Sequence, residues 1–92
     1  MKDVLQKQLT AGKETDFIMK LKRSQFLVKN FTDGAIQVRL GTNDSISIIG
    51  SGSWERVFNN MEHGVTEGIE STNVVKITAD TDGLVEVASI DF

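Results

Sequence analysis

The chain has 92 residues, of which 39% are hydrophobic and 25% are charged, with a formal net charge of −3. These values are typical of one small globular domain and exclude a disordered chain. Because cysteine is absent, the sequence also excludes a disulfide framework, a thiol nucleophile and a cysteine-ligated zinc site.

Apolar and polar residues alternate along most of the chain, which is the period of half-buried β-strands. We expect residues 1–14 to form an extended N-terminal arm, within which residues 2–9 fit either a short helix or a first strand. The residues expected to face the core are Phe17, Met19, Leu21, Phe26, Val28, Ile36, Val38, Leu40, Ile46, Ile48, Val75, Ile77, Val85 and Val87. With a further strand at 54–58, the sequence predicts a single all-β domain over residues 1–92. We expect an antiparallel β-sandwich or jelly-roll-like barrel of about seven or eight short strands.

Turn residues separate the predicted strands. Residues 30–34 end in Asp33-Gly34, a pair suited to a tight hairpin turn, and further breaks fall at residues 41–44, 50–53 and 80–83. Residues 59–73 contain two glycines and three glutamates and fit a long loop. Because loops of this length are uncommon in small domains, this one is either a flexible connection or a contact surface.

Proline, which often blocks the edges of β-sheets, is absent from the sequence. Lys20, Lys22 and Lys29 are candidates to protect the edges by pointing outward from edge strands. The alternative is that the edges pair with other copies of the chain.

The charges are distributed unevenly. Residues 1–30 contain seven basic and three acidic residues, whereas residues 31–92 contain three basic and ten acidic ones. This pattern fits a basic arm that docks on an acidic partner or on a neighbouring copy. It also fits solvated strand faces whose charges only keep the protein soluble.

The motifs of metal sites and enzymes are incomplete in this sequence. His63 is the only histidine, and Glu62, Glu67 and Glu70 lack the alternating spacing of a calcium loop. Residues 80–83 fit a hairpin turn as well as a cation site, and Gly50-Ser51-Gly52 has neither the phosphate-loop nor the nucleophile-elbow pattern. We therefore expect no metal, no cofactor and no enzymatic activity.

Trp54 is the only tryptophan and begins a predicted strand. It fits a core or subunit-interface position better than a platform on which a sugar stacks. Lys20, Lys22 and Arg23 fit a solvated edge strand better than a phosphate-binding stripe, because the isoelectric point is about 5.0 and tyrosine is absent. The candidate contact residues are Trp54, Lys20, Lys22, Arg23, Glu62 and Glu67.

Residues 26–38 (FLVKNFTDGAIQV) join an apolar strand to a polar Asp-Gly turn and a second strand. Residues 46–54 (ISIIGSGSW) and 84–87 (LVEV) add a strand, a small-residue turn before tryptophan and a closing strand. Over roughly residues 15–58 and 73–90 this pattern resembles small structural or accessory proteins of tailed phages and prophages. The resemblance implies a virion-associated or assembly protein and carries over no catalytic or binding residue.

We therefore expect a non-enzymatic protein of the head-decoration or accessory type, acting by self-association and docking. The expected partners are other copies of the chain and other phage structural proteins, with no nucleic acid and no membrane. The first residues carry no signal-peptide pattern and no stretch has the length of a membrane helix, so the expected location is the virion or the host cytoplasm. The alternative is a β-sandwich module that binds carbohydrate or a receptor.

Overall fold

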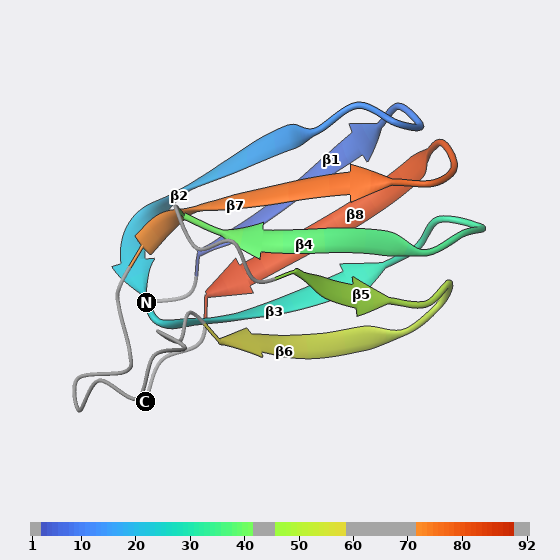
Figure 1. Ribbon diagram of the computed structural model, residues 1–92. Coiled ribbons are helices and arrows are strands. Elements are labelled where there is room, and N and C mark those ends of the chain that lie inside the picture. The colour runs from blue at the N-terminus through green and yellow to red at the C-terminus, as the bar shows by residue number, and fades with distance from the viewer. Residues whose placement is uncertain (1–2, 42–45, 59–71, 90–92) are drawn as a thin grey trace.

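The protein folds into eight β-strands and no helix within the residues that the computed structural model describes, 3–41, 46–58 and 72–89 (Figure 1). The strands are β1 (Val4–Leu9), β2 (Thr15–Arg23), β3 (Gln25–Asn30), β4 (Ile36–Leu40), β5 (Ser47–Ile49), β6 (Trp54–Phe58), β7 (Thr72–Ala79) and β8 (Gly83–Ser89). Within these ranges no helical segment has the length and apolar character needed to cross a membrane. Residues 4–9 form β1, so of the two structures that the sequence allowed for residues 2–9, a short helix or a first strand, the described part is a strand.

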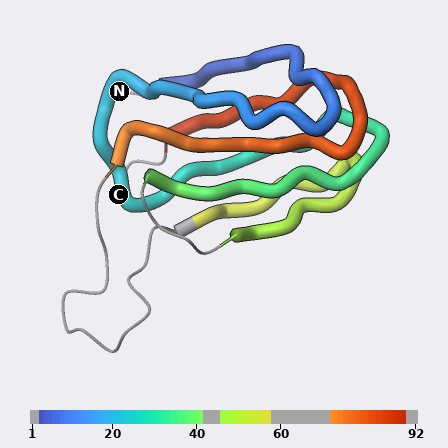
Figure 2. The backbone as a smooth tube through the Cα atoms, turned by 45° about the horizontal axis from the view of Figure 1, so that its top comes forward, coloured from blue at the N-terminus to red at the C-terminus, as the bar shows by residue number. Residues whose placement is uncertain are grey.

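The strands form two antiparallel sheets of four, which lie as two layers (Figure 2). Sheet A has the order β1-β8-β3-β6 and sheet B the order β2-β7-β4-β5. Each strand pairs with the one that stands equally far from the other end of the chain: β1 with β8, β2 with β7, β3 with β6 and β4 with β5. Nested pairing of this kind across two sheets is the jelly-roll arrangement, so the predicted fold class is confirmed.

The core lies between the two sheets and is built from alternate residues of nearly every strand. Its largest fully buried side chains include Phe17 of β2 and Phe26 of β3. The complete set is Leu9, Phe17, Met19, Phe26, Val28, Ile36, Val38, Leu40, Ile49, Val57, Val75, Ile77, Ala79, Val85 and Val87. Because strand side chains alternate between faces, the residues next to each of these point to the outside of the sandwich.

The prediction that Ile46 and Ile48 face the core is wrong. Ile46 and Ile48 are 56% and 67% exposed, and Ile49 is the residue that enters the core. The pairing of β4 with β5 sets Ile49 opposite the buried Ile36, which turns Ile48 outward. Two consecutive apolar positions, Ile48 and Ile49, in a three-residue strand do not determine which of them faces inward.

The prediction of a hairpin at Asp33-Gly34 is also wrong. β3 belongs to sheet A and β4 to sheet B, so residues 31–35 carry the chain across the sandwich. The glycine serves close packing here, because a Cβ on Gly34 would lie 3.1 Å from Cγ2 of Thr81. Among the described strands, β4 and β5 are the only consecutive pair within one sheet.

Asn30 holds several crossing segments together at one end of the sandwich. Its side chain is buried, and its Nδ2 donates to the backbone oxygens of Gly34 (2.8 Å), Ile49 (3.1 Å) and Gly50 (3.1 Å). Its Oδ1 accepts from both the backbone nitrogen and the hydroxyl of Thr32. One amide thus bonds backbone groups of the β3–β4 connection, the end of β5 and the β5–β6 connection.

We expect Asn30→Ala to lower the free energy of unfolding by about 3 kcal/mol, because the buried Ile49 carbonyl and two part-buried carbonyls lose their donor and the buried Thr32 nitrogen loses its acceptor. Urea unfolding followed by circular dichroism measures this loss. Gln37→Ala is the matched control, since it removes an exposed amide from β4 and should change stability by less than about 0.5 kcal/mol. Equal losses in the two variants would contradict the role of Asn30.

Candidate functional site

All four sheet edges carry features that oppose pairing with another strand. The edge strands of sheet A each place a charged residue on the core side, Lys7 in β1 opposite Val85 and Glu55 in β6 opposite Val28. Nζ of Lys7 donates to the backbone oxygen of Asp16 at 2.9 Å and lies 5.6 Å from the centre of the Phe17 ring. Inward-pointing charges are a known device against edge-to-edge association.

The edges of sheet B are irregular or short. β5 has three residues, and the pairing of β2 with β7 shifts between Ile18 and Arg23. Lys20 and Lys22 are exposed on this part of β2, as expected, whereas Lys29 lies on the inner strand β3 and protects no edge. Extension of either sheet by another copy is therefore disfavoured, and binding must use the faces or the ends of the sandwich.

The irregular part of β2 is held by Asp3. Where Met19 to Lys22 face only Asn73 of β7, the ladder cannot satisfy every backbone group of β2. The buried carboxylate of Asp3 accepts hydrogen bonds from the backbone nitrogens of Lys20 and Leu21, and the side-chain amide of Asn73 donates to the oxygen of Met19. These hydrogen bonds thus fix the backbone of the segment that carries Lys20 and Lys22.

We expect Asp3→Ala to destabilise the protein by about 2 kcal/mol, since two backbone N–H groups of the β2 bulge lose their acceptor. Thermal and urea unfolding measure the effect. Asp16→Ala removes an exposed carboxylate from the same strand and should cost less than about 0.5 kcal/mol. If both variants unfolded alike, Asp3 would not be what stabilises the bulge.

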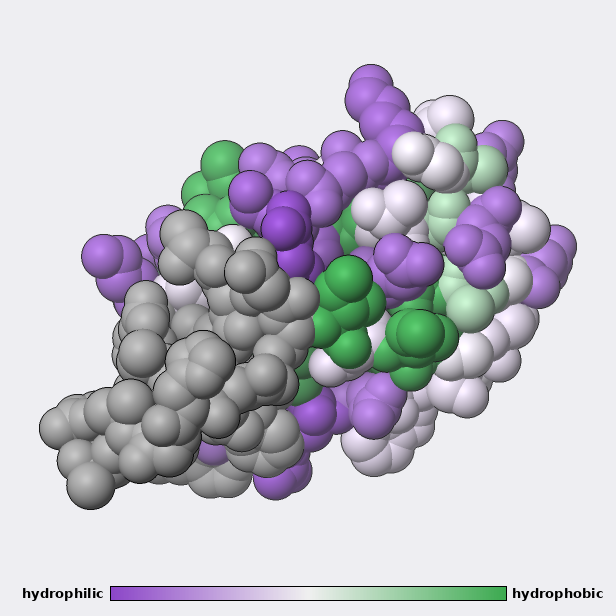
Figure 3. Space-filling model, in the orientation of Figure 1, coloured by the Kyte–Doolittle hydropathy of each residue, from purple (hydrophilic) through white to green (hydrophobic). Residues whose placement is uncertain are grey.

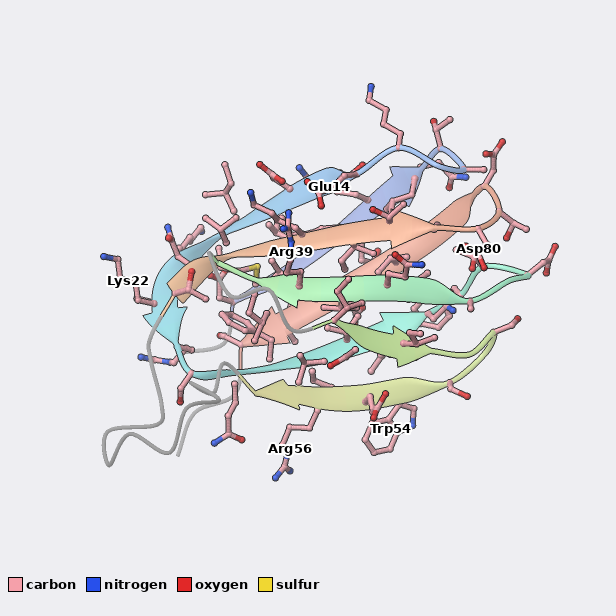
Figure 4. The ribbon with its side chains drawn as sticks, in the orientation of Figure 1. Glu14, Lys22, Arg39, Trp54, Arg56 and Asp80 are labelled. Atoms are coloured by element: carbon pink, nitrogen blue, oxygen red, sulfur yellow. The ribbon has the colours of Figure 1, made fainter. Side chains whose placement is uncertain are left out.

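The residues predicted from sequence as a contact set do not form one site. Trp54 lies on β6 of sheet A, whereas Lys20, Lys22 and Arg23 lie on or at the end of β2 in sheet B. Figure 4 shows Lys22 and Trp54 well apart. Glu62, Glu67 and His63 lie outside the described residues.

The outer face of sheet A brings Trp54 together with residues that sequence reasoning did not select. Strand register aligns Gln6, Glu86, Lys29 and Trp54 in one row across β1, β8, β3 and β6; we call this the Trp54 row. Nε2 of Gln6 donates to Oε1 of Glu86 at 2.7 Å, and Nζ of Lys29 lies 3.5 Å from Oε2 of the same carboxylate. A continuous polar line therefore ends at an indole that is 65% exposed.

Apolar side chains flank the Trp54 row. Phe31, which is 55% exposed, continues the outward side of β3 two positions beyond Lys29, and its backbone nitrogen donates to the oxygen of Leu84. On the other side of the row, Val4, Ala88 and Leu27 are aligned across β1, β8 and β3, and the charged Arg56 continues this row on β6. The signal for these residues was present in the sequence, because Leu27, Lys29 and Phe31 alternate with the core positions of β3.

The position of Trp54 decides between two of its expected roles. The core position is excluded by its exposure, and the surface roles, a subunit interface or a platform for a sugar, stay open.

The outer face of sheet B is different in character. Arg39 and Glu14, labelled in Figure 4, form an ion pair of 3.1 Å. Asp16 is paired in register with Lys76. Exposed Ile18 and Ile48 lie on the two opposite edge strands of this sheet. On the side of the molecule seen in Figure 3, hydrophobic side chains form small groups surrounded by hydrophilic ones. The outer face of sheet A is thus the better candidate for a binding surface.

In the part of the chain that the structure describes, no three histidine, cysteine, aspartate or glutamate side chains gather as a metal site requires. Comparison with known proteins returned no matching family, no matching curated protein and no matching solved structure. These comparisons therefore assign neither a family nor a function to the chain.

The exposure of Trp54 can be measured directly, because it is the only tryptophan. In dilute protein we expect acrylamide to quench its fluorescence nearly as efficiently as that of free indole, with an emission maximum typical of indole in water. Unfolded protein in urea is the reference. A blue-shifted spectrum with weak quenching in the dilute native protein would contradict the exposed position.

Proposed function

We propose that this protein is a non-catalytic binding module that acts as an accessory or assembly component of a phage particle. The observation that carries the proposal is the outer face of sheet A, where an exposed tryptophan ends a row of hydrogen-bonded polar groups. Large rigid aromatic residues at the surface contribute strongly to protein interfaces. The resemblance of residues 15–58 and 73–90 to tailed-phage structural proteins supplies the biological setting.

The architecture supports docking by a preformed face. Two sheets packed on one core hold the backbone of β3, β6 and β8 in place, so the side chains of the Trp54 row lose little freedom on binding. The protected edges also favour a defined contact over open-ended sheet growth. A structural protein of a particle needs such a limited set of contacts.

A second candidate function is carbohydrate binding, favoured by the presence of Trp54 and Phe31 on one face that also carries the carboxylate of Glu86 and, at the far end of the same row, the amide of Gln6. Aromatic faces bind the apolar side of a sugar ring while amides and carboxylates bind its hydroxyls. A panel of oligosaccharides titrated against Trp54 fluorescence discriminates the two functions. A saturable spectral change with a sugar would favour this second candidate.

The proposal is tested by complementing a deletion of the gene in its host and purifying the particles after induction. Mass spectrometry of the particles should find the unaltered protein in many copies. Trp54→Ala should reduce its incorporation by at least about tenfold, because the anchor of the face is lost. Ile48→Ala is the matched control, since it removes an equally exposed apolar side chain from sheet B and should be incorporated normally.

Particles that lack the unaltered protein would contradict the proposed function. Equal incorporation of the Trp54 and Ile48 variants would leave the particle setting intact and assign docking to another surface.

A further inference from the structure

We infer that the outer face of sheet A binds the same face of a second copy of this chain across a twofold axis. The inference rests on the proposed function and names its first partner. The axis runs parallel to the strands between β8 and β3, the two inner strands of the sheet. Each copy then places its β3 over β8 of the partner and its β6 over β1 of the partner.

Charge complementarity at the centre of the face carries this inference. Lys29 and Glu86 are paired in register on the two inner strands, so they stand on either side of the proposed axis. The twofold rotation exchanges their positions and sets Lys29 of each copy against Glu86 of the other. Four charges then alternate in sign around the axis, an arrangement that an isologous contact creates from a single ion pair.

The same rotation matches the rest of the face. Trp54, at the β6 end of its row, comes over the amide of Gln6 at the β1 end of the partner's row. In the neighbouring rows Phe31 comes over Leu84, and Leu27 over Ala88. Apolar groups meet apolar groups at these positions, while Arg56 at the β6 end of the Leu27 row comes over the partner's Val4. The exposed indole gains a planar polar group to stack on.

The contact also has the geometry of common face-to-face packing between two β-sheets. Sheets pack face to face at about 10 Å with their strands aligned to within about 30°, which is the angle that their twist imposes. A face of four short strands is small compared with permanent dimer interfaces, so we expect a dimer that dissociates on dilution. The protected edges disfavour the competing mode, in which the sheets of two copies join side by side.

Charge exchange at Lys29 and Glu86 tests the inference. Light scattering of the unaltered chain should show a dimer at high protein concentration that weakens on dilution and in high salt. Lys29→Glu and Glu86→Lys should each raise the dissociation constant by about a hundredfold or more, because each sets like charges against each other at two symmetric contacts. Circular dichroism establishes that both variants are folded.

Mixing the two variants is the decisive step. One variant presents two acidic groups at the centre of the face and the other presents two basic groups, so the mixture should form a heterodimer although each variant alone is monomeric. The intramolecular ion pair is lost in both variants, so only contact between copies explains a restored mass. The fluorescence of Trp54 should also be less accessible to acrylamide in the mixture than in either variant alone.

The matched controls are Arg39→Glu and Glu14→Lys, which make the same kinds of charge change in the ion pair on sheet B. Both should dimerise like the unaltered chain. A monomer at every concentration, a mixture that stays monomeric, or an oligomer broken by these controls would each overturn the inference. A monomeric chain that is nevertheless found in particles would overturn the inference and leave the proposed function standing. A dimer that is absent from particles would overturn the proposed function and leave the inference standing.

Discussion

The burial of the Asn30 amide decides which residues of β3 face the core and which lie on the outer face of sheet A. The amide reaches its partners in the two neighbouring connections only when Asn30 points inward from β3. Because side chains alternate, this orientation places Phe26 and Val28 in the core and turns Leu27 and Lys29 outward. A shift of β3 by one residue would bury Lys29 and expose Phe26, and the cost of burying an unpaired charge makes that arrangement unfavourable.

The topology gives this single amide its importance. In a jelly roll most connections cross from one sheet to the other, so part of their backbone leaves the regular ladders and needs other partners. At the other end of the sandwich the carboxylate of Asp3 accepts hydrogen bonds from backbone nitrogens in the bulge of β2. Two buried polar side chains, one near each end, thus satisfy the backbone where the ladders stop. The regular part of the fold is left with an uninterrupted apolar core.

Alternation of apolar residues was sufficient to predict the fold class and most of the core, because Phe17, Ile36 and Val85 each lie in strands long enough to show the period. It failed for Ile48, where the strand is too short for the phase to be determined locally. It failed for Asp33-Gly34 because a glycine required by close packing and a glycine required by a hairpin look alike in sequence. The candidate face was missed for a related reason. Gln6, Glu86, Lys29 and Trp54 are distant in the chain and are brought into one row only by strand register.

The symmetry of the inferred contact limits what the rest of the molecule can do. When two copies meet through sheet A, their sheet B faces point in opposite directions, away from the twofold axis. Such a dimer cannot place both of its sheet B faces on one flat surface, so pairing would bring no avidity for a single surface. Trp54 is covered in the inferred contact, so its loss would act on incorporation by separating the two copies. Ile48 lies on the outward sheet B face and takes no part in this contact, so its loss would leave both the pair and its incorporation unchanged.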